Sequence, residues 1–427
     1  MPPNNDHPKS WSLKPFSPEC LAPECPDNLA TSRGSDHKLD CLRGENLEET
    51  FGIPHHRSHR TYQWCATDIA LDEMNESIMM IDQLTKEGCR KQLRSASSGG
   101  ALFFVACGFH RPHVPWRFPA EVLKFFPKNL NDVPLPKYSS VPEDIPLEAW
   151  HAPNDVFGLK LGFNATQSGK LLREYRLAYA ASVTYVDAMI GKVLEDLRAL
   201  GREENTLVVL SSDHGYSLGE QGIWDKMSNF ETALRVPLIM RAPWLPQAAG
   251  MVSSSLAELL DLYPTIAELA GLPDPRGEGE GLDGSSLASI LVGGGRGNSA
   301  SQKHFAFSQF GKPSYNRPFR LNTNTPREKL ELMGYSIRTN RWRYTVWFGF
   351  NGSSLTPDLS DISARELYDH RNDAGGFDDP AEQNNVVGLP EHSSLIEYLH
   401  QELIQHIGRD GTEKAWHHGG LSVLSFS

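Results

Sequence analysis

The feature that most constrains the fold is a long helical pattern followed directly by a short β-branched run. Between residues 170 and 200, apolar residues recur at helical spacing and predict one buried stripe. The stripe consists of Leu172, Tyr179, Val183, Val186, Ile190, Val193 and Leu197. Gly201 follows, where a helix commonly ends in a left-handed residue. Residues 206–210, Thr-Leu-Val-Val-Leu, then predict a central strand of a parallel sheet, because such strands are buried on both faces.

Similar patterns occur on both sides of this pair. We predict a buried strand at 102–106, a further strand at 236–240 and a further helix at 255–270. An earlier helical pattern at 68–84 is expected to close at Gly88. Strands that alternate with helices predict an α/β fold with a mostly parallel sheet and helices on both faces.

Three regions are expected along the chain. Residues 1–64 are rich in Pro, Ser, His and Asn with little apolar periodicity, which predicts an irregular N-terminal segment. Residues 65–297 hold the α/β core and end in a Gly-rich stretch. Residues 298–427 predict a smaller C-terminal subdomain with antiparallel strands. Its strand-like runs are 304–310, 335–338 and 342–348, and its helix is 394–407 with Gly408 just past the end.

Composition and short sequence patterns indicate which binding partners and which cellular compartments suit this protein. The 427 residues carry a formal net charge of −12, which argues against nucleic acid as a main partner. The longest apolar run, 101–109, is far shorter than the roughly 20 residues of a spanning helix, so no membrane span is expected. The N-terminus shows no signal-peptide pattern, whereas Asn-x-Ser/Thr triplets at Asn75, Asn164 and Asn351 suit a secreted protein. The oligomeric state stays open.

The strand at 206–210 leads into a candidate metal site. Ligands of open α/β sheets bind beyond the carboxyl ends of the strands, and Asp213 and His214 lie there, followed by Gly215. A carboxylate and an imidazole side by side can reach one cation. Oxygen ligands suit Ca²⁺ or Mg²⁺, and the imidazole also admits zinc or manganese. A structural alternative stays open, in which Asp213 caps the turn and His214 bonds nearby.

Two histidines and one lysine elsewhere in the sequence suggest that the substrate is an anion. The strand at 102–106 leads to His110 and His113, and Pro112 prevents the helix that would place both histidines on one face. Contact of one histidine with an anion is therefore favoured over a metal pair. Lys226 stands in an aromatic stretch just before a predicted strand, which favours a cleft over the usual solvated position of a lysine.

Several longer segments resemble the sulfatase family. Residues 211–230, SSDHGYSLGEQGIWDKMSNF, with the Arg-Val-Pro-Leu of 235–238, resemble the second half of a sulfatase active site. Residues 103–115, FFVACGFHRPHVP, resemble a substrate-facing segment. Further family-like segments are 261–271, 282–287, 333–339 and 343–347. The likeness runs from about Trp11 to about Tyr368.

The resemblance implies an alkaline-phosphatase-like α/β fold, a bound Ca²⁺ and hydrolysis of a sulfate ester. Asp213 and His214 correspond to two Ca²⁺ ligands, His110 and Lys226 to catalytic residues that contact the sulfate, and Tyr216 to a substrate-binding residue at the sugar site. In physical terms, the ion and the cationic side chains stabilise charge that develops on the sulfuryl oxygens. A histidine near the bridging oxygen can also protonate the leaving alcohol.

The same resemblance implies a substrate and a compartment. The substrate expected is a sulfated glycosaminoglycan, heparan or dermatan sulfate, and the location is lysosomal or secretory. Cys41 and Cys65 correspond to a disulfide pair of the family, which suits an oxidising compartment.

The nucleophile of the family is not apparent in the sequence. Sulfatases convert the cysteine of a Cys-x-Pro-Ser-Arg segment to formylglycine, and none of the six cysteines stands in that context or in a zinc pattern. The paired aspartates of the family's Ca²⁺ site are missing too. We therefore expect a chain that begins partway through its domain, lacks the first strands and is inactive by itself.

Two alternatives stay open. The first is a non-catalytic sulfatase-like protein that binds sulfated glycans through His110 and Lys226. The second is a phosphate-ester hydrolase of the same superfamily, which the segment 333–347 disfavours.

Overall fold

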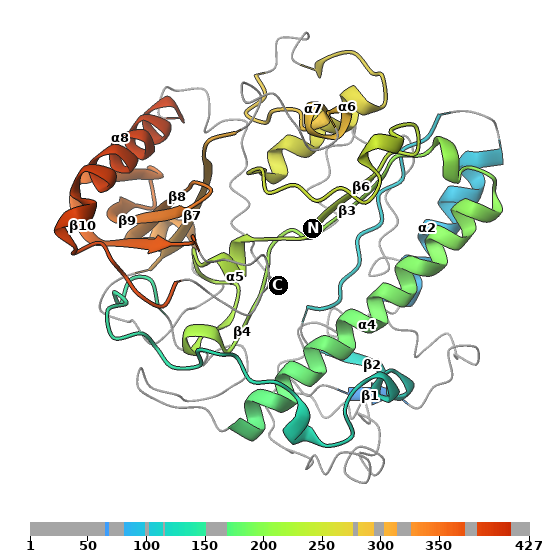
Figure 1. The fold of residues 1–427 in the computed structure, drawn as a ribbon, viewed down its shortest axis with the longest axis horizontal. Helices are drawn as coiled ribbons and strands as arrows, with labels where there is room; N and C mark the ends of the chain where they lie inside the picture. The colour runs from blue at the N-terminus through green and yellow to red at the C-terminus, as the bar shows by residue number, and fades with distance from the viewer. Residues whose placement is uncertain are drawn as a thin grey trace. The chain divides into compact units, whose positions relative to one another are not determined.

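The structure is a computed structural model, and its described residues form two compact units (Figure 1). One unit consists of the described residues within 1–135 and 168–204, and the other of those within 136–167 and 205–426. The described residues are 65–67, 81–98, 102–113, 116–150, 169–275, 281–293, 303–313, 326–371 and 382–410. The predicted irregular segment 1–64 and Cys41 lie outside them. The boundaries of the three regions stay a prediction.

The first unit is organised around two long helices. α2 (Ile81–Ser98) packs against α4 (Gly169–Ala199), and Nε and Nη2 of Arg90 each lie 3.0 Å from a carboxylate oxygen of Asp196. α4 matches the helix predicted at 170–200, and Gly201 follows with a φ of +66°. By length and composition alone, residues Leu172–Ala199 of α4 could cross a membrane, and α4 also contacts α2 and β2.

Short elements complete this unit. β1 (Cys65–Thr67) pairs in parallel with β2 (Arg117–Pro119), and the 3₁₀ helix η4 (Ala120–Phe125) follows β2 directly. The side chain of Phe118 on β2 is fully buried, and α4 contacts both β2 and η4.

Two predictions for this unit are wrong. The helix expected to close at Gly88 continues to Ser98, because packing of α2 on α4 outweighs the cost of one helical glycine, about 1 kcal/mol. Residues 102–106, predicted as a buried strand, have no regular secondary structure and belong to no sheet in the described part of the chain. Leu102 and Phe104 are 96% and 68% exposed, because a strand is buried only where neighbouring strands and helices cover it.

The second unit contains the strand that leads to the candidate site. β3 (Val208–Ser211) pairs with β6 (Leu238–Arg241), and Val208 lies opposite Arg241. Both strands occur near their predicted positions, but the pairing is antiparallel, so the predicted mostly parallel sheet is not confirmed in the described residues. A parallel pair needs a crossover connection, usually a long helix. The only α-helix between β3 and β6 is α5 (Glu231–Leu234), which is too short for that role.

A four-stranded antiparallel sheet lies near the C-terminus, in the order β10-β9-β8-β7. Its strands are β7 (Ala306–Lys312), β8 (Leu332–Arg338), β9 (Trp342–Asn351) and β10 (Thr356–Asp369). The three predicted strand-like runs overlap β7, β8 and β9. α8 (Ser393–Asp410) contacts β8 and β9, and it continues two residues past the glycine at which it was predicted to end.

Both faces of β9 are buried, which explains its nearly continuous apolar sequence. Tyr344, Val346 and Phe348 belong to one core cluster with Leu399 and Leu403 of α8. Trp347, which alternates with them, belongs to a second cluster with, among others, Ile145, Trp150, Ile223 and Phe230.

The remaining elements of the second unit are short. α6 (Leu262–Leu269) lies inside the helix predicted at 255–270, and α7 (Ala288–Val292) contacts it. β4 (Ser217–Leu218) pairs antiparallel with β5 (Trp224–Asp225), directly after the Asp213–His214 turn.

Candidate active site

In the turn after β3, the hydrogen bonding of His214 shows which ring nitrogen carries the proton. His214 Nδ1 lies 2.8 Å from the carbonyl oxygen of Gly215. Because a carbonyl only accepts hydrogen bonds, Nδ1 carries the proton and Nε2 carries the lone pair. Burial, aided by the charge of Lys226, lowers the pKa of His214 and favours the neutral ring. A neutral histidine that donates its other N–H to a backbone carbonyl is the usual state of a metal ligand.

Asp213 supplies a second donor next to this imidazole. Its Oδ2 lies 3.6 Å from His214 Nε2, and its side chain is 68% exposed. Its Oδ1 accepts the backbone N–H of His214 at 3.1 Å, so the structural role considered for Asp213 is also present. The carboxylate and the imidazole together fit two positions of a divalent cation site.

Lys226 interacts electrostatically with both Asp213 and His214. Burial lowers the pKa of its ammonium group to about 8, and the charges of Asp213 and Asp225 oppose that shift. The ammonium group is therefore charged at neutral pH. The structure thus brings Asp213, His214 and Lys226 together, and Tyr216 lies two residues beyond His214 in the same turn.

His110 lies in the other unit, in the segment that follows residues 102–106. It is exposed, and its ring centroid lies 4.8 Å from that of His113. Its backbone N–H donates to Asp82 Oδ1 at 2.6 Å. The role of His110 at the sulfate stays a prediction.

Helix α5 is hydrogen-bonded to the residues that follow the Asp213–His214 turn. The N–H of Gly215 donates to the carbonyl of Ala233 at 2.7 Å, and the hydroxyls of Ser217 and Thr232 lie 2.7 Å apart. A Cβ at position 215 would lie only 2.1 Å from the carbonyl oxygen of Thr232. Glycine is therefore required by the close approach of the two backbones.

A buried ion network joins α5 to the antiparallel sheet, and sequence reasoning missed it. Arg343 pairs with Glu231 of α5 and lies 2.5 Å from Glu382, and Arg338 also pairs with Glu231. Burial alone would raise the pKa of Glu231, but the two arginines outweigh it and lower the pKa to about 2. The one available signal was an arginine within the apolar run of β9, since buried charges occur almost only in pairs.

The carboxylates of this network also approach His370. Ligand atoms of Glu231, His370 and Glu382 all lie within 4.8 Å of one another, the spacing of a metal site. Arg343 pairs with both carboxylates and Arg338 adds a second positive charge at Glu231, so we interpret the cluster as a structural ion network.

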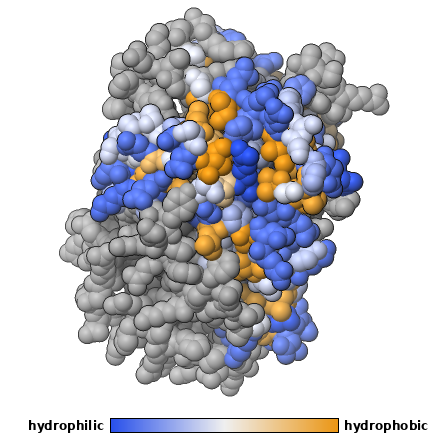
Figure 2. Space-filling model, turned by 90° about the vertical axis from the view of Figure 1, so that its left-hand side faces the viewer, coloured by the Kyte–Doolittle hydropathy of each residue, from blue (hydrophilic) through white to orange (hydrophobic). Residues whose placement is uncertain are grey.

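A groove in the second unit contains none of the predicted site residues. It lies between α8 and β10, has a volume of about 810 Å³ and includes Tyr344, Arg365 and His400 in its lining. Figure 2 views the side of α8 and β10 and shows small apolar patches between polar ones.

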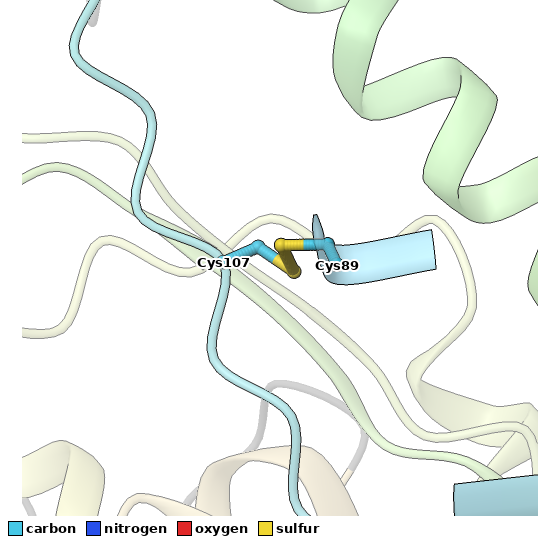
Figure 3. Close-up of a disulfide and its surroundings, with 2 residues drawn as sticks. All are labelled: Cys89 and Cys107. Carbon is cyan, nitrogen blue, oxygen red and sulfur yellow. A yellow bond between two sulfur atoms is a disulfide. The ribbon is translucent and has the colours of Figure 1, made fainter. Parts of the chain in front are cut away.

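The described residues include a disulfide that the sequence did not predict. Cys89 of α2 is bonded to Cys107, and their Cα atoms are 5.9 Å apart (Figure 3). The predicted partner pair, Cys41 and Cys65, is not tested, because Cys41 lies outside the described residues.

Comparison with known families identifies the class of protein. The family model described as Sulfatase matches residues 48–272, and that of N-sulphoglucosamine sulphohydrolase, C-terminal, matches residues 219–409. The chain belongs to the sulfatase family, whose members are sulfuric ester hydrolases and generally bind a divalent metal.

Within the sulfatase family and among solved structures, the following proteins are similar to this chain. Iduronate 2-sulfatase of Mus musculus is 32% identical over 445 residues, which cover 93% of this chain and 73% of the relative. Among solved structures, the phosphonate monoester hydrolase SpPMH from Silicibacter pomeroyi has a TM-score of 0.57 at 24% identity. BT4656 in complex with D-glucosamine-2-N,6-O-disulfate has a TM-score of 0.56 at 23% identity. The matches cover 78% of this chain and 60% and 71% of those structures, respectively, and both show the fold alone.

Proposed function

We propose that this chain carries the metal- and sulfate-binding part of a sulfatase site that acts on 2-sulfated uronic acid residues of glycosaminoglycans. The observation that carries the proposal is the grouping of Asp213, a neutral His214 and the cationic Lys226 beside one strand end. The similarity to iduronate 2-sulfatase supports the choice of sugar.

Each residue has a proposed role. Asp213 and His214 hold a Ca²⁺ ion, which when bound stabilises negative charge on the sulfuryl oxygens. Lys226 offers a second positive charge to the same oxygens. His110 contacts the sulfate and protonates the leaving alcohol, and Tyr216 borders the sugar. A lysosomal or secretory compartment is proposed as well, and it suits the Cys89–Cys107 disulfide.

Metal binding tests the first half of the proposal. We expect calorimetric titration of the purified chain with Ca²⁺ to give one site, which Asp213→Ala removes. Asp187→Asn is the control, because Asp187 is exposed on α4 and lies in the other unit. Unchanged Ca²⁺ binding in Asp213→Ala would contradict the assignment of Asp213 as a ligand.

Turnover of a sulfate ester tests the proposed roles of the residues that contact the substrate. A fluorogenic 2-sulfated iduronide and its phosphate analogue are offered to the purified chain and to Lys226→Ala. Turnover of the sulfate ester that Lys226→Ala abolishes supports the hydrolase and contradicts the prediction that the chain alone is inactive. Faster turnover of the phosphate analogue would overturn the proposed substrate class.

A further inference from the structure

The segment that carries His110 is anchored to α2 at several points close to that residue. Cys107, three residues earlier, is bonded to Cys89 of α2 (Figure 3). Asp82, also on α2 and fully buried, accepts the backbone N–H of His110 at 2.6 Å and that of Arg111 at 3.3 Å. All of these residues belong to the first unit.

Further contacts hold the residues just after His110. Nη1 of Arg111 lies 3.7 Å from Asp82 Oδ2, and the arginine side chain is itself buried. The indole N–H of Trp116 donates to the carbonyl of Pro112 at 2.8 Å, and the N–H of His113 donates to the carbonyl of His110 at 2.9 Å. The backbone is therefore held before, at and after His110.

These anchors matter because the segment belongs to no sheet in the described part of the chain. Ladder hydrogen bonds, which normally fix an extended segment, are replaced here by a disulfide and by one buried carboxylate. The imidazole itself is exposed. An exposed side chain on a fixed backbone is the arrangement needed by a group that must meet a substrate in one geometry.

We infer that Asp82 and the Cys89–Cys107 disulfide are positioning residues for His110, and that reducing this disulfide loosens the His110 backbone. The inference rests on the proposed function only for the contact between His110 and sulfate. In the reduction, a dithiol such as dithiothreitol supplies two electrons and two protons. The S–S bond breaks, Cys89 and Cys107 become thiols, and the dithiol is oxidised to its cyclic disulfide.

Hydrogen exchange at single amides tests the positioning directly. We expect Asp82→Ala to speed exchange of the His110 and Arg111 amides roughly tenfold, the effect of losing one hydrogen bond. Asp82→Asn keeps an acceptor oxygen, so it should restore most of the protection. A general loss of stability would speed exchange throughout the α2–α4 core as well, so core amides and those of β8 and β9 serve as internal controls.

The disulfide is tested by substitution, because a reductant would also reach any other cystine. The double variant Cys89→Ser/Cys107→Ser should speed exchange at residues 105–111. Addition of dithiothreitol should produce the same change in wild type and no further change in the double variant. Unchanged exchange at His110 in both the Asp82→Ala and the double variant would overturn the inference, whatever the activity.

Sulfate binding separates this inference from the proposed function. We expect calorimetric affinity for inorganic sulfate to fall several-fold in His110→Ala, in Asp82→Ala and in the double cysteine variant, and to recover in Asp82→Asn. Faster exchange at His110 with sulfate binding unchanged even in His110→Ala would uphold the positioning and overturn the proposed contact of His110 with sulfate. Sulfate binding that depends on His110 but not on Asp82 or the disulfide would overturn the positioning role.

Discussion

His214 and Lys226 show how burial tunes two neighbouring side chains for different tasks. Burial lowers the pKa of His214, and the neutral ring that results is the form able to bind a metal. Burial also lowers the pKa of Lys226, but only to about 8, so the ammonium group keeps its charge at neutral and acidic pH. The charged lysine is held at a cost to stability, because part of its hydration is lost.

That cost predicts a stabilising substitution. In the unfolded chain Lys226 titrates near 10.5, so the penalty is complete below about pH 8 and fades as the pH rises toward 10.5. Lys226→Met should therefore raise the free energy of unfolding at pH 7 by about 1–2 kcal/mol, after allowance for partial exposure. Urea unfolding at pH 7 and pH 10 measures it, with exposed Lys91→Met as control. An equal gain at both pH values would show that the charge is not the cause.

We expect substitution of Gly215, in the same site, to destabilise the fold. A Cβ there meets the Thr232 carbonyl at 2.1 Å, so Gly215→Ala must push the turn away from α5. We expect a loss of about 1–3 kcal/mol of unfolding free energy, together with weaker Ca²⁺ binding. Gly191→Ala on α4 has open space around its added Cβ and should instead stabilise slightly. Equal effects of the two substitutions would contradict the steric explanation.

Among the elements, α5 connects the candidate site to the antiparallel sheet. It binds the Asp213–His214 turn through Gly215 and Ser217 on one side. On the other side, Glu231 pairs with Arg338 of β8 and Arg343 of β9, and Asn229 just before α5 donates to the carbonyl of Gly334 at 2.9 Å. The position of the site turn therefore depends on a sheet that follows it by about a hundred residues.

Arg343 is the residue whose loss should disturb this connection most. Arg343→Met leaves Glu231 and the fully buried Glu382 without their shared cation, and breaking a buried pair costs about 3–5 kcal/mol. In wild type, the pairing of Glu231 stabilises the fold above pH 4.5, and this contribution is lost as the pH falls toward 2. Chemical unfolding across this range measures both effects.

The matched control for this substitution is Arg341→Met, because Arg341 is largely exposed and pairs with Asp369 at the surface. We expect a change below about 1 kcal/mol there. A loss in Arg341→Met as large as in Arg343→Met would contradict the view that burial makes the Arg343 network important.

Helix and strand positions were largely predictable, but pairing was not. The positions of α4 and β3 followed from local patterns, but of the stripe predicted for α4 only Leu172, Val186 and Leu197 are buried, and Val183 is 40% exposed. The antiparallel partner of β3 did not follow, because strand direction depends on the connection between strands. Residues 102–106 have the apolar content of a strand and were misassigned, since burial depends on neighbours that sequence pattern does not reveal.

Across the whole molecule, the formal net charge is negative, although the proposed substrate is itself an anionic glycan. The formal charge of −12 at pH 7 repels a sulfated polysaccharide over distances of about a Debye length. The chain also holds 16 histidines, and protonating them would take the formal charge through zero. Acidification to about pH 5 therefore changes long-range repulsion into weak attraction.

We accordingly expect affinity for a heparan sulfate oligosaccharide to rise between pH 7 and pH 5 at low ionic strength. Fluorescence anisotropy with a labelled oligosaccharide measures it, and a desulfated oligosaccharide serves as the control. The increase should shrink at high salt, because screening removes long-range terms first. An affinity that falls with acidification would show that one titrating group, not the net charge, controls binding.

The sequence by itself determined which residue types stand at the strand end, because the Asp-His-Gly turn, the lysine and the preceding strand are local features of one stretch of chain. It also determined the family, because several such stretches occur in order. Only the tertiary structure decided the pairing of Cys89 with Cys107, the buried network around Arg343 and the direction of β6 against β3. Each of these depends on residues that are distant in sequence and meet only when the chain folds.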